Sequence, residues 1–291
     1  MKIGAVASCF APQTDPDQLV QLARDLDERG FDSLWFGEHV LLFDEMEFPY
    51  PGSADGRLPI PEGQGAPDQV AMIGFLASQT KQLRFGTSIS LIPQRNPVYT
   101  AKEWATLDWL SGGRVELGVG VGWCKEEVES CGYGWNDRGA RCDEALELMQ
   151  KLWRDPVINH MGNHFDVRQA RMDPKPSNGI PLIIGGYSDA ALKRTARVGD
   201  GWYGFGLTPD LAAGMLQRLD AALAEEGKTR SDINILMMPG DDSMEAAKTF
   251  QELGVDRLVP MIDTAQDHRA RLDYLSELAL SVADGGADGV A

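Results

Sequence analysis

The 291-residue sequence predicts an α/β fold, a single (β/α)8 barrel of the TIM type with insertions after the second strand and before the fifth. Three observations predict it. Short apolar segments alternate with segments of helical spacing, helix start and stop signals lie between them, and no linker divides the chain. Eight such units over this length fit a closed barrel better than an open doubly wound sheet. We expect one domain over residues 1–291, with about eight flexible residues at its C-terminus.

Eight segments have the composition of barrel strands. In chain order they are residues 2–8, 33–39, 83–90, 114–121, 181–185, 201–205, 233–238 and 257–262. A helical pattern follows each, with apolar residues spaced at three and four after the first strand: Leu19, Leu22, Ala23 and Leu26. Helices should begin at the capping pairs Asp15-Pro16, Asn96-Pro97 and Thr208-Pro209, and end at Gly30, Gly227 and Gly254.

Two connections are too long to be simple turns. Residues 40–66 follow the second strand, and residues 155–179 separate the fourth helix from the fifth strand. Long connections in compact domains tend to be functional. Because active sites of this fold lie at the C-terminal ends of the strands, residues 40–66 are a candidate lid over the substrate. The alternative is that residues 40–66 are only a variable surface loop.

The composition excludes several classes of partner. The chain carries 44 acidic and 27 basic residues, a net charge of −17, which disfavours nucleic acid and anionic membrane surfaces. No run of 18 apolar residues occurs, and the N-terminus lacks the pattern of a secretory leader. The four cysteines include no C-x-x-C pair. We expect a cytoplasmic protein with reduced thiols, whose partners are small molecules or other subunits.

The predicted fourth strand carries an unusual glycine face. Gly118, Gly120 and Gly122 alternate with valines, so the three glycines share one side of the strand. Interior strand glycines are costly, which indicates that a ligand or another backbone approaches this side. The spacing is wrong for a dinucleotide fingerprint.

The C-terminal ends of the other strands supply the candidate chemistry. Glu38 and His39 end the second strand, and an imidazole there can move a proton near neutral pH. Gly185, Gly186 and Ser188 lie between a strand and a helix, where backbone N–H groups can hold a phosphate, although such turns also occur without ligands.

Two other kinds of chemistry are not expected. Carboxylates do not recur on successive strand ends and no strand ends near a lysine, which argues against metal-assisted and imine chemistry. His160 and His164 are spaced by four, but they lie in a polar insertion without a carboxylate motif. We therefore expect no metal site.

Five segments, taken in order around one barrel, resemble the bacterial luciferase-like family of flavin and deazaflavin oxidoreductases, in particular its coenzyme F420-dependent branch. The resemblance covers most of the chain. The segments are LWFGEHV (34–40), GTSISLIPQRNPV (86–98), SGGRVELGVGVGW (111–123), RGARCDEALELMQKLW (138–153) and PLIIGGYSDAALKRTARVGDGW (181–202).

The resemblance implies a cofactor ring at the C-terminal mouth of the barrel, beside Gly120, Gly122 and Trp123. It implies that the cofactor phosphate lies at Gly185, Gly186 and Ser188. His39 aligns with a histidine that assists proton movement during hydride transfer, and Glu38 takes the place of its acidic neighbour. Ser88-Ile89 aligns with a cis peptide bond that lies behind the ring.

At two positions this chain differs from the sugar-phosphate dehydrogenases of the F420-dependent branch that it resembles. Trp123 stands where the sugar-phosphate dehydrogenases of the branch carry a glutamate, and Phe43 stands where they carry a tryptophan. A sugar-phosphate substrate is therefore not expected. The resemblance implies an oxidoreductase that transfers a hydride between coenzyme F420 and an unidentified organic substrate. Alternatives are an FMN-dependent monooxygenase and a non-catalytic flavin-binding barrel.

Two further features bear on cofactor and assembly. Arg138, Arg141, Lys193 and Arg194 could meet a long anionic cofactor tail, but helix-surface or ion-pair roles are the stronger interpretation. Because luciferase-like barrels commonly pair, we expect a homodimer. The third helix offers apolar residues for this contact, although they would serve equally as core: Trp104, Leu107 and Trp109.

Overall fold

The computed structural model describes residues 1–53 and 55–283. Within this part, eleven strands form one curled sheet whose pairings are all parallel. They are β1 (Lys2–Ile3), β2 (Ala5–Ser8), β3 (Ser33–Phe36), β4 (Arg84–Thr87), β5 (Ser90–Leu91), β6 (Val115–Gly120), β9 (Leu182–Gly185), β10 (Gly201–Leu207), β11 (Asn234–Pro239), β12 (Arg257–Leu258) and β13 (Met261–Asp263). The C-terminal residues predicted to be flexible lie outside the described residues.

The sheet closes on itself. β1 and β2 form one barrel strand interrupted at Gly4, and they pair with β12 and β13, respectively. On the other side, β2 pairs with β3 and β12 pairs with β11, so the first and last strand positions are neighbours in the ring. The predicted (β/α)8 barrel is confirmed, with eight strand positions and an interruption in the first, third and eighth.

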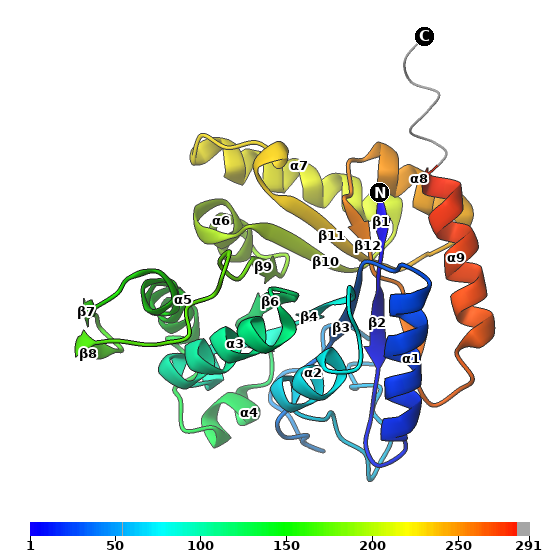
Figure 1. Ribbon diagram of the computed structural model, residues 1–291. Coiled ribbons are helices and arrows are strands. Elements are labelled where there is room, and N and C mark those ends of the chain that lie inside the picture. The colour runs from blue at the N-terminus through cyan, green and yellow to red at the C-terminus, as the bar shows by residue number, and fades with distance from the viewer. Residues whose placement is uncertain (54, 284–291) are drawn as a thin grey trace.

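Helices surround the strands on the outside (Figure 1). They are α1 (Pro16–Glu28), α2 (Gln69–Ala77), α3 (Pro97–Ser111), α4 (Lys125–Ser130), α5 (Arg138–Arg154), α6 (Asp189–Val198), α7 (Pro209–Glu225), α8 (Met244–Glu252) and α9 (Arg269–Ala283), with 3-10 turns η1 (Ile92–Gln94) and η2 (Arg230–Asp232). Asp15 and Asn96 cap α1 and α3 through their side chains, as the sequence predicts. Thr208 precedes α7 but makes no side-chain capping bond.

The core has two layers. The larger layer lies between strands and helices, and it contains Trp104 and Leu107. These two residues are therefore core, whereas Trp109 is 65% exposed and is the only one of the three free to form a subunit contact. The smaller layer comprises Val6, Trp35, Ile183, Tyr203, Leu236, Met238 and Val259, with Ile89 packed against it.

The two insertions differ. Apart from Ala54, which is outside the described residues, residues 40–66 run between β3 and α2 without a helix, and a single bridge joins Gly65 to Ala11. The second insertion contains a hairpin of β7 (Ile158–Met161) and β8 (Asp166–Ala170), which lies beside α5 (Figure 1).

All four cysteines are free thiols. None of the described helices is long and apolar enough to cross a membrane.

Candidate functional site at the C-terminal mouth of the barrel

Parallel strands of a barrel end at one mouth, so the segments after β3, β5, β6 and β9 meet there. A bulge separates β4 from β5, because both pair with β6 but in different registers: Gly86 is opposite Glu116, whereas Ser90 is opposite Val119. The peptide bond Ser88-Ile89 within this bulge is cis, as the family resemblance implied.

The glycine face of β6 packs against this bulge. A Cβ atom on Gly118 would lie 1.7 Å from the Thr87 carbonyl oxygen, and one on Gly120 would lie 1.8 Å from Cδ1 of Ile89. Of the two explanations that the sequence left open, a neighbouring backbone is therefore correct for Gly118. At Gly120 the Ile89 side chain occupies the space that a Cβ would need, and the contact of Gly120 with the cofactor stays a prediction.

His39 lies just beyond β3 and is oriented by a residue that sequence reasoning missed. Its Nδ1 is 3.1 Å from Oε2 of Glu127, and the other carboxylate oxygen accepts the Val40 amide at 2.6 Å. Glu127 lies in α4 and is 1% exposed. Glu127 lies in the first helix after the glycine-rich strand β6, and this position in the sequence could have suggested it as a site residue.

Glu127 is held in its ionised form. Burial raises the pKa of Glu127, but the hydrogen bond and charge of His39 and the Val40 amide lower it further, so its net pKa lies below the ordinary value. An ionised carboxylate has no proton to donate, so every bond it makes here is accepted. Glu127 therefore fixes both the His39 ring and the start of the insertion.

Glu38, which the resemblance implies as the acidic neighbour of His39, lies in a buried ion pair. Its Oε2 accepts the Leu91 amide and its Oε1 accepts the guanidinium of Arg95, with the Arg95 Nε at 2.8 Å. The Glu38 side chain is 4% exposed. Both oxygens therefore join β3 to the segment after the bulge, while a part for Glu38 in catalysis stays a prediction.

Aromatic side chains line the region beside His39. The Trp123 ring lies edge-on to the His39 ring, with 5.9 Å between the ring centroids, and the centroids of the Tyr50 and Trp123 rings are 5.2 Å apart. Tyr50 belongs to the first insertion, so this segment reaches Trp123, while its part as a lid stays a prediction. Gly122 precedes Trp123 with a φ of 78°, a conformation that favours glycine and turns the chain at the strand end.

The strand-to-helix turn at Gly185, Gly186 and Ser188 has the geometry of an anion cradle. Ser188 caps α6 by accepting the Ala191 amide at 3.2 Å. Gly186 has a φ of 118°, and a Cβ there would lie 3.0 Å from the Ala191 methyl. The backbone therefore approaches the helix N-terminus closely, which is where N–H groups attract phosphate.

Two buried hydroxyls, Ser88 Oγ and Tyr203 Oη, lie close to each other near the bulge, and neither makes another hydrogen bond among the described residues. Buried polar groups are normally hydrogen-bonded. With the Ser188 turn and the partly exposed rings of Trp123 and Tyr50, these hydroxyls fit a planar, polar cofactor with a phosphate. Ser88 and Ile89 would lie behind its ring, and the Ser188 turn would hold its phosphate.

The remaining candidate residues have structural partners. Arg141, Lys193 and Arg194 pair with Asp137, Glu225 and Asp143, respectively, and Arg138 lies over the Trp135 ring at 3.5 Å. His160 contacts Glu144 and His164 contacts Asp137. No group of three or more potential metal ligands occurs among the described residues.

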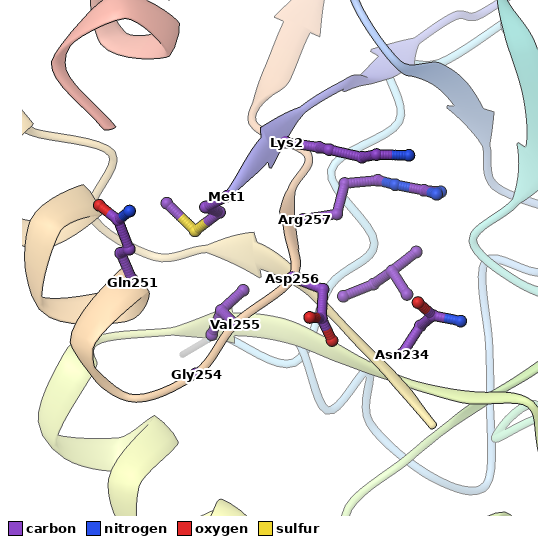
Figure 2. Close-up of a pocket in the computed structure, with 9 residues that line it drawn as sticks. Met1, Lys2, Asn234, Gln251, Gly254, Val255, Asp256 and Arg257 are labelled. Carbon is purple, nitrogen blue, oxygen red and sulfur yellow. The ribbon is translucent and has the colours of Figure 1, made fainter. Parts of the chain in front are cut away.

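A cavity of about 500 Å³ lies at the opposite end of the barrel (Figure 2). Lys2, Asn234 and Arg257, which begin strands, line it, so it lies at the N-terminal ends of the strands. Lys2 and Arg257 lie side by side there, and both pair with Asp32. Because this end of the fold serves stability, we place the functional site at the other mouth.

Most of the chain resembles proteins of a known family. Residues 1–249 match the family model described as "Luciferase-like monooxygenase". An uncharacterized protein of Mycobacterium tuberculosis is 30% identical over 247 residues, 84% of this chain and 85% of that protein. The F420-dependent glucose-6-phosphate dehydrogenase of Amycolatopsis mediterranei is 32% identical over 207 residues, 69% of this chain and 56% of that protein.

A similar fold occurs among solved structures. An F420-dependent secondary alcohol dehydrogenase, in complex with an F420-acetone adduct, superposes with a TM-score of 0.80 at 20% identity. The superposition covers 97% of this chain and 98% of that chain. At this identity the likeness shows the fold, while the family model covers most of the chain. The chain belongs to the luciferase-like monooxygenase family.

Proposed function

We propose that this chain is an oxidoreductase that transfers a hydride between coenzyme F420 and a small organic substrate. The observation that carries the proposal is His39, held at the mouth of the barrel by Glu127 and placed beside Trp123. Two relatives of this chain are named as F420-dependent glucose-6-phosphate dehydrogenases, which supports the choice of cofactor. Bound coenzyme F420 would supply the hydride-accepting ring.

His39 is the proposed proton acceptor and donor. An alcohol that loses a hydride must also lose its hydroxyl proton, and an imidazole near neutral pH is suited to take it. Glu38 remains outside this step, because its carboxylate is occupied by Arg95 and the Leu91 amide. Ser88, Ile89 and Trp123 are proposed to contact the ring, while Gly185, Gly186 and Ser188 are proposed to contact the phosphate.

The proposed substrate is uncharged rather than a sugar phosphate. The side chains nearest His39 and Trp123 include the Tyr50 ring, and the insertion begins with the exposed apolar residues Val40, Leu41 and Leu42. The two nearby cations already have partners: Arg95 pairs with Glu38 and Lys125 with Glu47. An anionic substrate would have to compete with these carboxylates for its binding energy.

FMN is the alternative cofactor, because the family is described as monooxygenases and the same turn and ring site could serve either molecule. Titration of the purified protein with coenzyme F420 and with FMN, followed by fluorescence, tests this choice. We expect tighter binding of coenzyme F420. Tighter binding of FMN, with consumption of oxygen by the reduced complex, would support the monooxygenase instead.

The four free thiols fit the reducing environment of the cytoplasm, where we propose that the protein acts.

Replacement of His39 tests the proposed chemistry. We expect His39→Ala to lower kcat by roughly 10²–10⁴-fold on an uncharged secondary alcohol, because proton transfer contributes about this factor. The Kd for coenzyme F420 should change little. His268→Ala is the matched control, since His268 pairs with Asp25 and lies outside the proposed site. Wild-type turnover in His39→Ala would exclude His39 from the reaction.

A further inference from the structure

We infer that Glu127 is a positioning residue that keeps His39 in one tautomer, with the proton on Nδ1 and the lone pair of Nε2 available to the substrate. The inference rests on the proposed function and deepens it, because it assigns the atom that moves the proton. It starts from a contact between residues 88 positions apart in the sequence.

The carboxylate of Glu127 has three donors around it. Oε2 lies 3.1 Å from His39 Nδ1, while Oε1 accepts the Val40 amide at 2.6 Å and the Leu41 amide at 3.4 Å. Because the carboxylate is ionised and 1% exposed, the proton between Oε2 and Nδ1 belongs to the ring. A neutral His39 ring then carries no proton on Nε2.

This tautomer suits the oxidation of an alcohol. The hydroxyl proton moves to Nε2, the hydrogen on the carbinol carbon leaves with its electron pair to the oxidised cofactor, and the carbon–oxygen double bond forms. Reduction of a carbonyl reverses each transfer. With the other tautomer, a neutral ring would present a proton at Nε2 and could not accept the hydroxyl proton there.

The Val40 and Leu41 amides make the inference testable with an isosteric variant. In Glu127→Gln, the amide oxygen of the new side chain must face these two backbone donors, because its NH2 group cannot accept from them. The NH2 group then faces His39 Nδ1. We expect the ring to present a lone pair at Nδ1 and to carry its proton on Nε2.

The direct test is nitrogen NMR of protein labelled with ¹⁵N in its histidine rings, recorded without cofactor at alkaline pH. The chain has four histidines, so the His39 signals can be assigned by their loss in His39→Asn. We expect wild-type protein to show a protonated Nδ1 and an unprotonated Nε2. Glu127→Gln should show the reverse, whereas Glu127→Asp should keep the wild-type tautomer.

Kinetics give an independent measurement. We expect Glu127→Gln to lower kcat by roughly 10²–10⁴-fold, as occurs when an orienting carboxylate becomes an amide and the wrong tautomer forms. The Kd for coenzyme F420, measured by fluorescence, should stay within about twofold, because the Glu127 side chain is 1% exposed and leaves almost no surface for a ligand to contact. Glu127→Asp keeps the charge, so its loss of kcat should be much smaller than that of Glu127→Gln.

Asp25→Asn is the matched control. Asp25 lies 2.9 Å from Nε2 of His268, another histidine–carboxylate contact, but one that is only partly buried and lies outside the site. This variant should alter the His268 signals and leave the His39 signals and kcat unchanged. Wild-type protein with the proton on Nε2 of His39, or an unaltered tautomer in a folded Glu127→Gln, would overturn the inference. Failure of the wild-type protein to oxidise any alcohol would instead count against the proposed function.

Discussion

Gly118 has no side chain, and this allows β6 to pack closely against the bulge between β4 and β5. Hydrogen bonds join Thr87 Oγ1 to the Gly118 amide and carbonyl at 3.0 and 2.9 Å, so the two strands lie in close contact. A Cβ would point directly at the Thr87 carbonyl oxygen. The cost of an interior glycine is therefore offset by the bulge that it accommodates.

We expect Gly118→Ala to lower the free energy of unfolding by about 2–4 kcal/mol, because the added methyl overlaps backbone that cannot move away cheaply. Gly214→Ala is the control: nothing lies within 4 Å of a Cβ at this position in α7, so alanine should stabilise the helix by about 0.5–1 kcal/mol. Denaturant unfolding measures both. Equal stability of the two variants would contradict the close packing of Thr87.

At the scale of elements, one carboxylate of α5 holds the turn of the β7–β8 hairpin. Glu144 accepts the amides of Asn163, His164 and Phe165 at 2.9, 3.0 and 2.8 Å, and it also contacts His160. Burial raises the pKa of Glu144, but these hydrogen bonds lower it to a net value below the ordinary one. The second insertion is therefore an ordered hairpin rather than a loop, and its histidines are parts of this contact.

Glu144→Gln should lower the free energy of unfolding by about 1–3 kcal/mol at neutral pH, because one amide oxygen cannot replace two charged acceptors. Since the folded pKa of Glu144 lies below its unfolded value, its contribution is complete above about pH 4.3. It is lost as the pH falls through the folded pKa.

The difference between wild type and Glu144→Gln should therefore shrink in acid, as followed by denaturant unfolding across pH. Glu147→Gln on the same helix is the control. Glu147 is exposed and pairs only with Lys151, so its loss should cost less than about 1 kcal/mol. A difference that grows as the pH falls would refute the role of Glu144.

At the scale of the whole molecule, α3 divides its residues between the core and the surface. Trp104 and Leu107 face the barrel, while Tyr99, Trp109 and Leu110 are at least 65% exposed. Large exposed apolar side chains on one helix favour a contact with another subunit. The net charge of −17 opposes self-association, and salt screens this repulsion.

We expect a homodimer that involves α3, with more dimer at higher salt. Trp109→Glu should shift the molecular mass measured by light scattering toward the monomer, because it places a charge in an apolar contact. Leu280→Glu is the control, since Leu280 is similarly exposed but lies on α9. A monomeric wild-type protein at all salt concentrations would show that the exposed α3 residues have another role.

Local patterns in the sequence determined much of this structure. The eight strand positions, the caps at Asp15 and Asn96 and the place of His39 after β3 follow from periodicity and capping, which act over a few residues. The cis bond at Ser88-Ile89 followed from resemblance alone, because nothing in the composition of that dipeptide predicts it.

Only the tertiary structure decided which partners these residues have. Glu127 reaches His39 and Arg95 reaches Glu38 because the barrel brings consecutive strand ends to one mouth, and no local spacing encodes these contacts. The same holds for Ile89, whose side chain fills the space above Gly120. The sequence indicated where the chemistry lies, while three-dimensional packing assigned the partners of His39 and Glu38, because such contacts depend on how distant strands are arranged.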